Sequence, residues 1–201
     1  MRERLMRVSK EKAAENREAL LQAASRLFRE HGIDGVGVAD IGREAGLTHG
    51  ALYAHFDSKE ALAAAAMARG LEASLDSMTR SAGEAPDLER HLDFLFSARM
   101  RDSLVGCPLA ASASEAARQG EAVSASFTEG FMGMAEIVEA SIDPALPAEQ
   151  RRRIAFTTIA AQIGAVAAAR AIAKVDAALS DELLASVRAV LAGIEHGASD
   201  A

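Results

Sequence analysis

Apolar residues recur along this chain at helical spacing. Near the start they follow one another at intervals of three and four, at Leu20, Ala23, Ala24, Leu27 and Phe28. This spacing places them on one stripe of a helix expected over Lys10–His31. Apolar and polar residues do not alternate over any strand-like length, and the sequence holds only four prolines. We therefore predict an all-α fold of about nine helices.

Capping residues and helix breakers set the expected boundaries. Ser9 is expected to cap the first helix and Gly32 to end it, and Ser58 is expected to cap a long fourth helix. The last five helices are expected at Asp87–Asp102, Pro108–Gln119, Glu121–Ile142, Ala148–Lys174 and Ser180–Glu195. Gly83, Pro86 and Gly106 fall in breaks of the pattern.

Residues 38–56, VADIGREAGLTHGALYAHF, have the spacing of a helix-turn-helix. The first of its helices stops at Gly46, because glycine leaves the right-handed helical region at low cost. Thr48 is a good N-cap for the second, whose inward face holds Leu52 and Phe56. The outward face carries small or hydrogen-bonding groups in place of the Glu and Lys of a merely solvated helix, which favours a binding face.

The distribution of charge along the chain leads to a different conclusion from the net charge. A net charge of −7 alone argues against nucleic acid. Residues 1–60, however, hold ten basic and ten acidic side chains, so the rest of the chain carries the whole negative excess. The N-terminal part is therefore relatively electropositive, as contact with nucleic acid requires.

The same N-terminal part resembles the TetR/AcrR family of transcription repressors. The resemblance covers approximately residues 16–63, about a quarter of the chain, and rests on NREALLQAASRLFREHGIDGVGVADIGREAGLTHGALYAHFDSKEAL. It implies a helix-turn-helix DNA-binding domain over residues 1–57 and a helical effector-binding and dimerisation domain over residues 58–201. The family usually caps the second helix with Ser or Thr, where this chain has Val36 and Gly37. Glycine is an acceptable cap, so we expect that helix to form.

By position, the resemblance implies DNA contacts centred on the second helix of the motif. The residues concerned are Arg43, Thr48, His49, Gly50, Ala51, Tyr53, His55 and Lys59. Hydroxyls, free amides at a helix start and lysines suit phosphate oxygens, whereas the histidines and Ala51 are candidates for reaching bases or backbone. Arg2, Arg4 and Arg7 are expected in a mobile arm. Tyr53 as a core residue, Lys59 as a solvated residue and the histidines as metal ligands are the alternatives.

An effector site is expected in the second domain, which contains most of the phenylalanines. Effector pockets are mainly apolar with a few orienting polar groups. The candidate lining residues are His91, Phe94, Met100, Cys107, Phe127, Phe131, Phe156 and Gln162. Ordinary core packing is the alternative for each of them. We therefore expect a small, largely apolar effector.

The last two long helices match the place where the family forms its dimer interface. Gly164 and many alanines allow close packing there. One short recognition helix reads few bases, whereas two related by a twofold axis read a palindrome. Residues 154–173 are also apolar enough to suggest a membrane span, but Arg170 near a bilayer centre would cost about 2.5–3.5 kcal/mol. We predict a homodimer and no membrane contact.

Cys107 is the only cysteine, so no intrachain disulfide forms and a reducing compartment is expected. It precedes Pro108 at an expected helix start, where the pKa of a thiol is lowered. Some regulators of the family with a similar motif resemble sensors of electrophiles or oxidants. A redox or electrophile switch through Cys107 is therefore the alternative to a ligand-controlled repressor. A small buried cysteine is the plainer interpretation.

The remaining patterns exclude other classes. The N-terminus lacks the apolar core of a secretory signal. No catalytic triad, metal-ligand or phosphate-loop spacing stands out, so we expect neither an enzyme nor a metal or other cofactor. The sequence predicts a cytoplasmic repressor that binds a palindromic operator in double-stranded DNA as a homodimer and is released by an effector.

Overall fold

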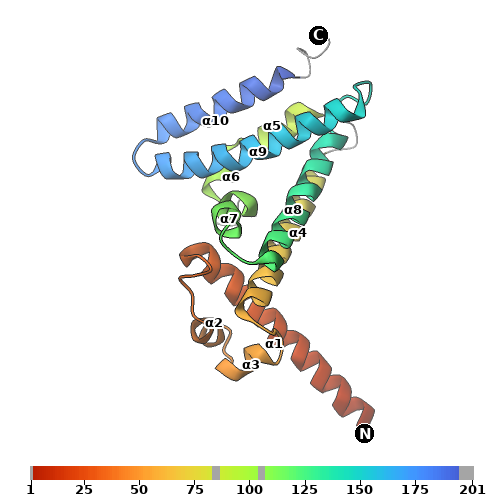
Figure 1. Ribbon diagram of the computed structural model, residues 1–201, viewed down its shortest axis with the longest axis vertical. Coiled ribbons are helices and arrows are strands. Elements are labelled where there is room, and N and C mark those ends of the chain that lie inside the picture. The colour runs from red at the N-terminus through yellow and green to blue at the C-terminus, as the bar shows by residue number, and fades with distance from the viewer. Residues whose placement is uncertain (1, 83–86, 104–106, 195–201) are drawn as a thin grey trace. The chain divides into compact units, whose positions relative to one another are not determined.

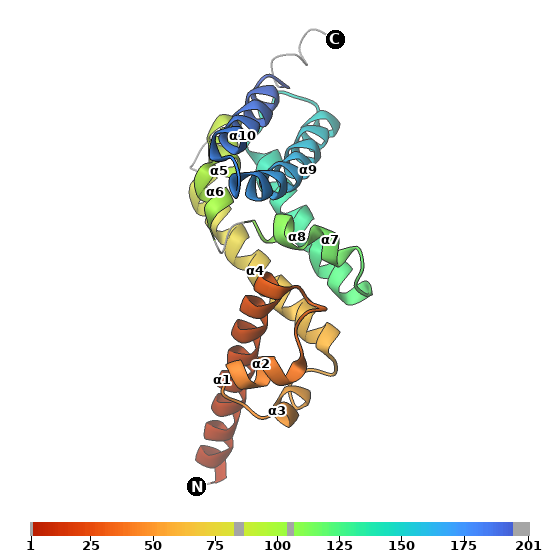
Figure 2. The same cartoon turned by 90° about the vertical axis from the view of Figure 1, so that its left-hand side faces the viewer.

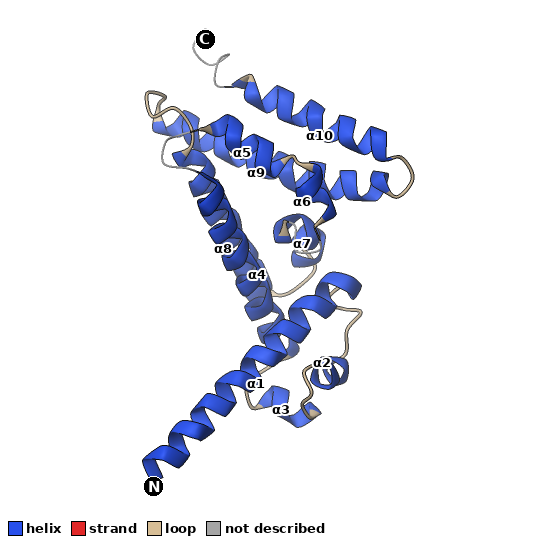
Figure 3. Ribbon diagram, turned by 180° about the vertical axis from the view of Figure 1, so that it is seen from behind, coloured by secondary structure: helices blue, strands red, loops and turns tan. Residues whose placement is uncertain are grey.

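The computed structural model describes residues 2–82, 87–103 and 107–194, and in these ranges all regular structure is helical (Figure 3). The helices are α1 (Arg2–His31), α2 (Val38–Glu44), α3 (His49–Tyr53), α4 (Lys59–Ala82), α5 (Leu88–Leu95), α6 (Ala98–Asp102), α7 (Pro108–Ala116), α8 (Glu121–Ala140), α9 (Ala148–Ala173) and α10 (Ala177–Ala192). The predicted all-α fold is confirmed.

The helix expected over Asp87–Asp102 is wrong, because the segment forms two helices, α5 and α6. Ser97 separates them. Its Oγ donates to the Phe94 carbonyl at 2.9 Å and accepts from the Met100 amide at 3.1 Å. A serine that satisfies backbone groups on both sides ends one helix and caps the next.

The first helix begins earlier than expected, at Arg2, and runs through Ser9 without a break. Residues 2–9 are mostly strong helix formers with neither glycine nor proline, so the capping preference of a single serine does not interrupt them. Arg2, Arg4 and Arg7 therefore lie on α1, and the expected mobile arm is wrong. The other end agrees with the expectation, because Gly32 has a φ of +76° and its amide donates to the Phe28 carbonyl.

The later boundaries differ by a few residues. The last helix starts at Ala177, ahead of the expected Ser180, because the Asp176 carboxylate accepts from the Leu179 amide at 3.0 Å and caps it. The breaks expected at Gly83 to Pro86 and at Gly106, and the helix end expected at Glu195, lie outside the described residues.

The chain divides into two compact units, which are considered separately below. The first unit is Met1–Arg69 with Ser114–Ser126, and the second is Gly70–Ala113 with Phe127–Ala201. Helix α4 starts at Lys59, capped by Ser58, whose Oγ accepts from the Ala61 amide at 3.0 Å. The expected domain boundary at residues 57 and 58 stays a prediction.

In the first unit, α2 packs against α1, and α3 packs against α2 (Figure 2). The side chains at the centre are fully buried, and they are Leu20, Ala24, Ile41, Leu52 and Leu62. The residues that follow α1 form hydrogen bonds with the end of α7 and with the turn after it. Glu115 Oε1 accepts from the Ile33 amide at 2.7 Å, and Gln119 donates to Asp34 at 3.0 Å.

In the second unit, α9 and α10 form an antiparallel pair (Figure 1). By length and composition α9 is apolar enough to cross a membrane. Its polar residues nevertheless bond within the unit. Gln162 is buried against Cys107, and Arg170 donates to the Arg101 carbonyl at 3.0 Å. These bonds favour a packed core helix over a membrane span.

Candidate nucleic-acid interface

The turn between α2 and α3 has the geometry that the sequence predicts. Gly46 has a φ of +67°, a conformation that favours glycine. One residue later the Leu47 amide donates to the Gly42 carbonyl at 2.8 Å. The chain therefore reverses tightly after α2 and starts α3 at once.

Gly42 fixes the approach of this turn, and sequence reasoning missed it. A Cβ at Gly42 would lie 3.2 Å from the Leu47 carbonyl oxygen and 3.6 Å from the Thr48 carbonyl carbon. A side chain here would need the Leu47 carbonyl to move by a few tenths of an ångström, so glycine favours the close approach of α3 to α2. The available signal was a glycine inside a two-turn helix, where it costs about 1 kcal/mol relative to alanine.

The start of α2 forms without the hydroxyl that the family usually supplies. Gly37 occupies the cap position in an extended conformation, and its amide donates to Asp40 Oδ2 at 3.3 Å. Asp40, in the first turn, thus satisfies the Gly37 amide, a backbone donor that has no partner within the helix. The expectation that this helix forms is confirmed.

Helix α3 buries one face and exposes the other. Leu52 is fully buried and Phe56 is 6% exposed, as the sequence predicts. Thr48 and Gly50 are exposed, and Tyr53 is 52% exposed, which is incompatible with the alternative of a core tyrosine. Thr48 occupies the cap position of α3, but its side chain makes no capping hydrogen bond. Its hydroxyl is therefore not needed to hold α3.

The other predicted contact residues lie on α3 or close to it in the chain. Ala51, His55 and Lys59 are half-buried. Arg43 is exposed at the end of α2 and pairs with Asp40, one turn earlier, at 3.0 Å. The side chain of His49 lies outside what the structure describes. An exposed pair of this kind holds its arginine weakly, so Arg43 can exchange partners at little cost.

Arg17 is a further basic residue beside this motif that sequence reasoning missed. Its guanidinium lies over the Phe56 ring, 4.9 Å from the centroid, and its side chain is exposed. A cation over an aromatic face at this distance is attracted by the ring. The contact links α1 to the residues that follow α3, and no local sequence pattern joins the two positions.

In the second unit, several candidate effector residues occur in pairs. Phe94 and Met100 line one cavity, which is described below. Phe131 and Phe156 meet edge to face with their centroids 5.5 Å apart. Cys107 and Gln162 are hydrogen-bonded, with Sγ donating to Oε1 at 3.4 Å. Of the remaining candidates, His91 is buried and Phe127 is half-buried.

The environment of Cys107 does not activate its thiol. Burial raises the pKa of Cys107, and this effect is larger than the opposing hydrogen bonds from the Ala110 amide and to Gln162. A thiol with a raised pKa and 1% exposure forms little thiolate at neutral pH. The geometry therefore favours the plain buried cysteine over the sensing cysteine.

Comparison with known proteins identifies the family. Residues 20–66 match the family described as bacterial regulatory proteins, tetR family. The HTH-type transcriptional repressor BepR of Brucella suis is 46% identical over 54 residues, which are 27% of this chain and 26% of BepR. A TetR transcriptional regulator from Chloroflexus aurantiacus has a crystal structure with a TM-score of 0.71 at 26% identity, covering 90% of this chain and 94% of that one. By this match residues 20–66 belong to the TetR family.

The TetR-family match includes all of α2, the turn and α3. A TetR-family regulator from Cytophaga hutchinsonii, with a TM-score of 0.73 at 24% identity, covers 92% of this chain and shares its fold. The probable regulator ArpR of Pseudomonas putida is 34% identical over 85 residues. This chain spans only 26% and 40% of the lengths of BepR and ArpR in these matches.

Proposed function

We propose that this TetR-family regulator is a cytoplasmic repressor that binds a palindromic operator as a homodimer and is released by a small, largely apolar effector. The observation that carries the proposal is the exposed face of α3. Thr48, Gly50 and Tyr53 are exposed there, on a helix whose opposite side is anchored by the fully buried Leu52. A short, firmly held helix with polar and small groups on its outer side suits the major groove of DNA.

The chemistry of that face fits a phosphate backbone as well as bases. The Thr48 hydroxyl makes no bond to its own helix, and Gly50 leaves open space beside the backbone. Tyr53 and Lys59 bring a phenol and an ammonium close to the same helix. Contacts to phosphates position such a helix, whereas contacts to base edges supply the specificity.

The surface of α10 supports the formation of a homodimer. The large hydrophobic side chains that stand exposed in the described part of the second unit are Val175 (94%), Leu179 (49%) and Val190 (70%). Leu179, the half-buried Leu183 and Val190 share one stripe of the helix. Apolar side chains on one stripe favour burial against a partner. A twofold-related copy would also pair the two recognition helices.

Selection of DNA fragments tests the proposed function. Purified protein is mixed with random duplexes, and bound fragments are sequenced. We expect a palindromic site, and we expect Tyr53→Ala with Lys59→Ala to weaken binding about tenfold or more and to flatten its dependence on salt. Arg188→Gln, in the second unit, is the control and should bind as the wild type does. Selection of no site, or equal binding by the double variant, would contradict the proposal.

The oligomeric state tests the dimer separately. Val190→Asp places a charge in the exposed stripe, whereas Ala189→Asp places the same charge on a different exposed face of α10. We expect Val190→Asp to shift the mass measured by light scattering from dimer to monomer, because a buried unpaired charge is costly. Ala189→Asp should remain a dimer. A wild-type monomer would rule out this interface.

A further inference from the structure

The second unit contains a cavity whose lining combines one cation, several hydroxyls and an apolar wall. It has a volume of about 140 Å³ and lies among residues of α4, α5 and α6 and the chain beside them. The lining residues that matter most are Ser74 of α4, Phe94 of α5, and Arg99 and Met100 of α6.

The volume sets the size of an occupant. One ordered water needs about 10–15 Å³ on this measure, and an engineered cavity of about 150 Å³ in another protein binds benzene. Pockets for drug-sized ligands are larger, about 300–1,000 Å³. A cavity of about 140 Å³ therefore has room for one benzene-sized group rather than for a long-chain or polycyclic molecule.

The charge of the lining sets the chemistry of the occupant. Arg99 is the one charged side chain among the described residues that line the cavity, and it forms no ion pair with any other described residue. Its neighbours Arg101 and Asp102 pair with each other instead, at 2.6 Å. A guanidinium without a carboxylate partner beside an apolar wall binds anions and repels cations.

We propose that this cavity binds a small organic anion, namely a carboxylate carried on a benzene-sized apolar group. Arg99 pairs with the carboxylate, Ser74 supplies a hydroxyl, and Phe94 and Met100 pack against the apolar part. The proposal rests on the proposed function in one respect, because it makes this anion the effector of the repressor.

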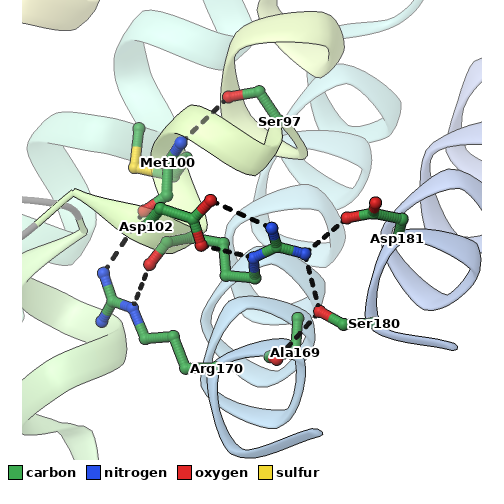
Figure 4. A network of polar contacts seen from close by, with 8 residues as sticks. Ser97, Met100, Asp102, Ala169, Arg170, Ser180 and Asp181 are labelled. Carbon is green, nitrogen blue, oxygen red and sulfur yellow. Dashed lines mark hydrogen bonds and ion pairs between the residues drawn. The ribbon is translucent and has the colours of Figure 1, made fainter. Parts of the chain in front are cut away.

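The position of α6 explains how occupancy would reach the α9 and α10 pair. Arg99 and Met100 lie on α6, and the next residue, Arg101, is anchored away from the cavity. The guanidinium of Arg101 donates to Ser180 at 2.9 Å and pairs with Asp181. Both partners, Ser180 and Asp181, are labelled in Figure 4.

A second arginine holds the end of the same helix. Arg170 of α9 donates to the carbonyls of Met100 at 3.3 Å and Arg101 at 3.0 Å, which are terminal acceptors of α6 (Figure 4). A short helix with one side on the cavity and the other bonded to α9 and α10 transmits any displacement to the helices that carry the exposed apolar stripe. Ligand and operator binding are then coupled, and by linkage each weakens the other.

Calorimetric titration tests the site with three probes: benzoate, its uncharged counterpart benzamide, and inorganic phosphate. We expect benzoate to bind the wild-type protein with a dissociation constant of about 1 mM or lower, and the other two at least about tenfold more weakly. Arg99→Gln should weaken benzoate binding about tenfold, and Arg99→Lys should restore part of it. Arg90→Gln, an exposed arginine of α5 outside the lining, should bind benzoate as the wild type does.

Each other outcome overturns the proposal. Benzamide that binds as well as benzoate would remove the role of the charge, and phosphate that binds as well would leave an adventitious anion site only. No benzoate binding, or equal binding by Arg99→Gln, would remove the site.

Operator binding measured without benzoate distinguishes failure of the anion site from failure of the proposed function. If Arg99→Gln and wild type bind operator equally but only the wild type releases it with benzoate, both proposals stand. If operator binding is intact and benzoate does not bind, only the anion site fails. Protein that binds no operator contradicts the proposed function, while the calorimetry still decides whether the site exists.

Discussion

Helices α3 and α6 have the same length of five residues but opposite relations to their surroundings. Ser97, at the cap of α6, accepts from the Met100 amide, and Arg101 within α6 is 9% exposed. Thr48, at the cap of α3, makes no capping bond, and the outer face of α3 is exposed. Ser97 and Arg101 are thus committed to hydrogen bonds inside the protein, whereas the Thr48 hydroxyl makes no bond to α3 and lies on an exposed residue.

The difference follows from the cost of burying polar groups. A buried donor or acceptor without a partner costs about 1–3 kcal/mol, which favours interior groups that bond to one another. Arg101 does so through Asp102, Asp181 and Ser180, and Ser180 in turn donates to the Ala169 carbonyl (Figure 4). Thr48 is exposed, so water can reach its hydroxyl until a partner replaces that water. A polar side chain therefore indicates a binding site only when its polar group is not already hydrogen-bonded within the protein.

We expect the largest loss of stability from removing Arg101. Arg101→Ala deletes several charge-assisted hydrogen bonds and leaves space in the packed unit. We expect the free energy of unfolding to fall by about 3 kcal/mol, allowing for the exposure of the two aspartates. Its neighbour Arg99→Ala should change it by less than about 0.5 kcal/mol. Urea unfolding of both variants measures the difference, and equal losses would contradict the assigned role of Arg101.

A second prediction concerns the interior position of Cys107. Since burial raises the pKa of this thiol and shields it, iodoacetamide should modify the folded chain at least about a hundredfold more slowly than the urea-unfolded chain. Mass spectrometry at timed intervals measures both rates. Rapid modification of the folded protein at neutral pH would restore the alternative of a Cys107 switch.

Alanine substitutions at the two cap residues, Ser97 and Thr48, distinguish a structural hydroxyl from a binding hydroxyl. Ser97→Ala should lower the free energy of unfolding by about 1 kcal/mol, because its side chain bonds to the backbone of α6. Thr48→Ala should cost less than about 0.5 kcal/mol but weaken binding to the selected operator. Thermal unfolding and operator titration of both variants distinguish the roles. A Thr48→Ala variant that loses as much stability as Ser97→Ala would place the Thr48 hydroxyl inside the fold.

The smallest expected effect concerns acid. The hydrogen bond from Arg101 lowers the pKa of Asp102 below its ordinary value of 3.8, more than partial desolvation raises it. A carboxyl with a lowered folded pKa stabilises the protein above its unfolded pKa, and this stabilisation is lost as pH falls through the folded value. The stability advantage of wild type over Asp102→Asn should therefore shrink as pH drops below about 4. Urea unfolding at a series of pH values measures it, and a constant difference would contradict the linkage.

Much of the fold could be predicted from the sequence because the relevant signals are local. The positive φ of Gly32 and Gly46, the cap at Ser58 and the inward position of Leu52 each depend on residues within a few positions. The helix starts at Arg2 and Ala177 were missed for a related reason. A capping residue competes with its neighbours, and local preference alone does not decide the outcome.

The all-helical fold, the helix-turn-helix and the outward positions of Thr48 and Tyr53 could be predicted, because periodicity and turn chemistry are encoded within one or two helical turns. The hydrogen-bond partners of the buried polar groups could not. The partners Arg101 and Ser180 are 79 positions apart, and Glu115 and Ile33 are 82 apart. Contacts over such separations depend on how the helices pack, and no local pattern specifies them.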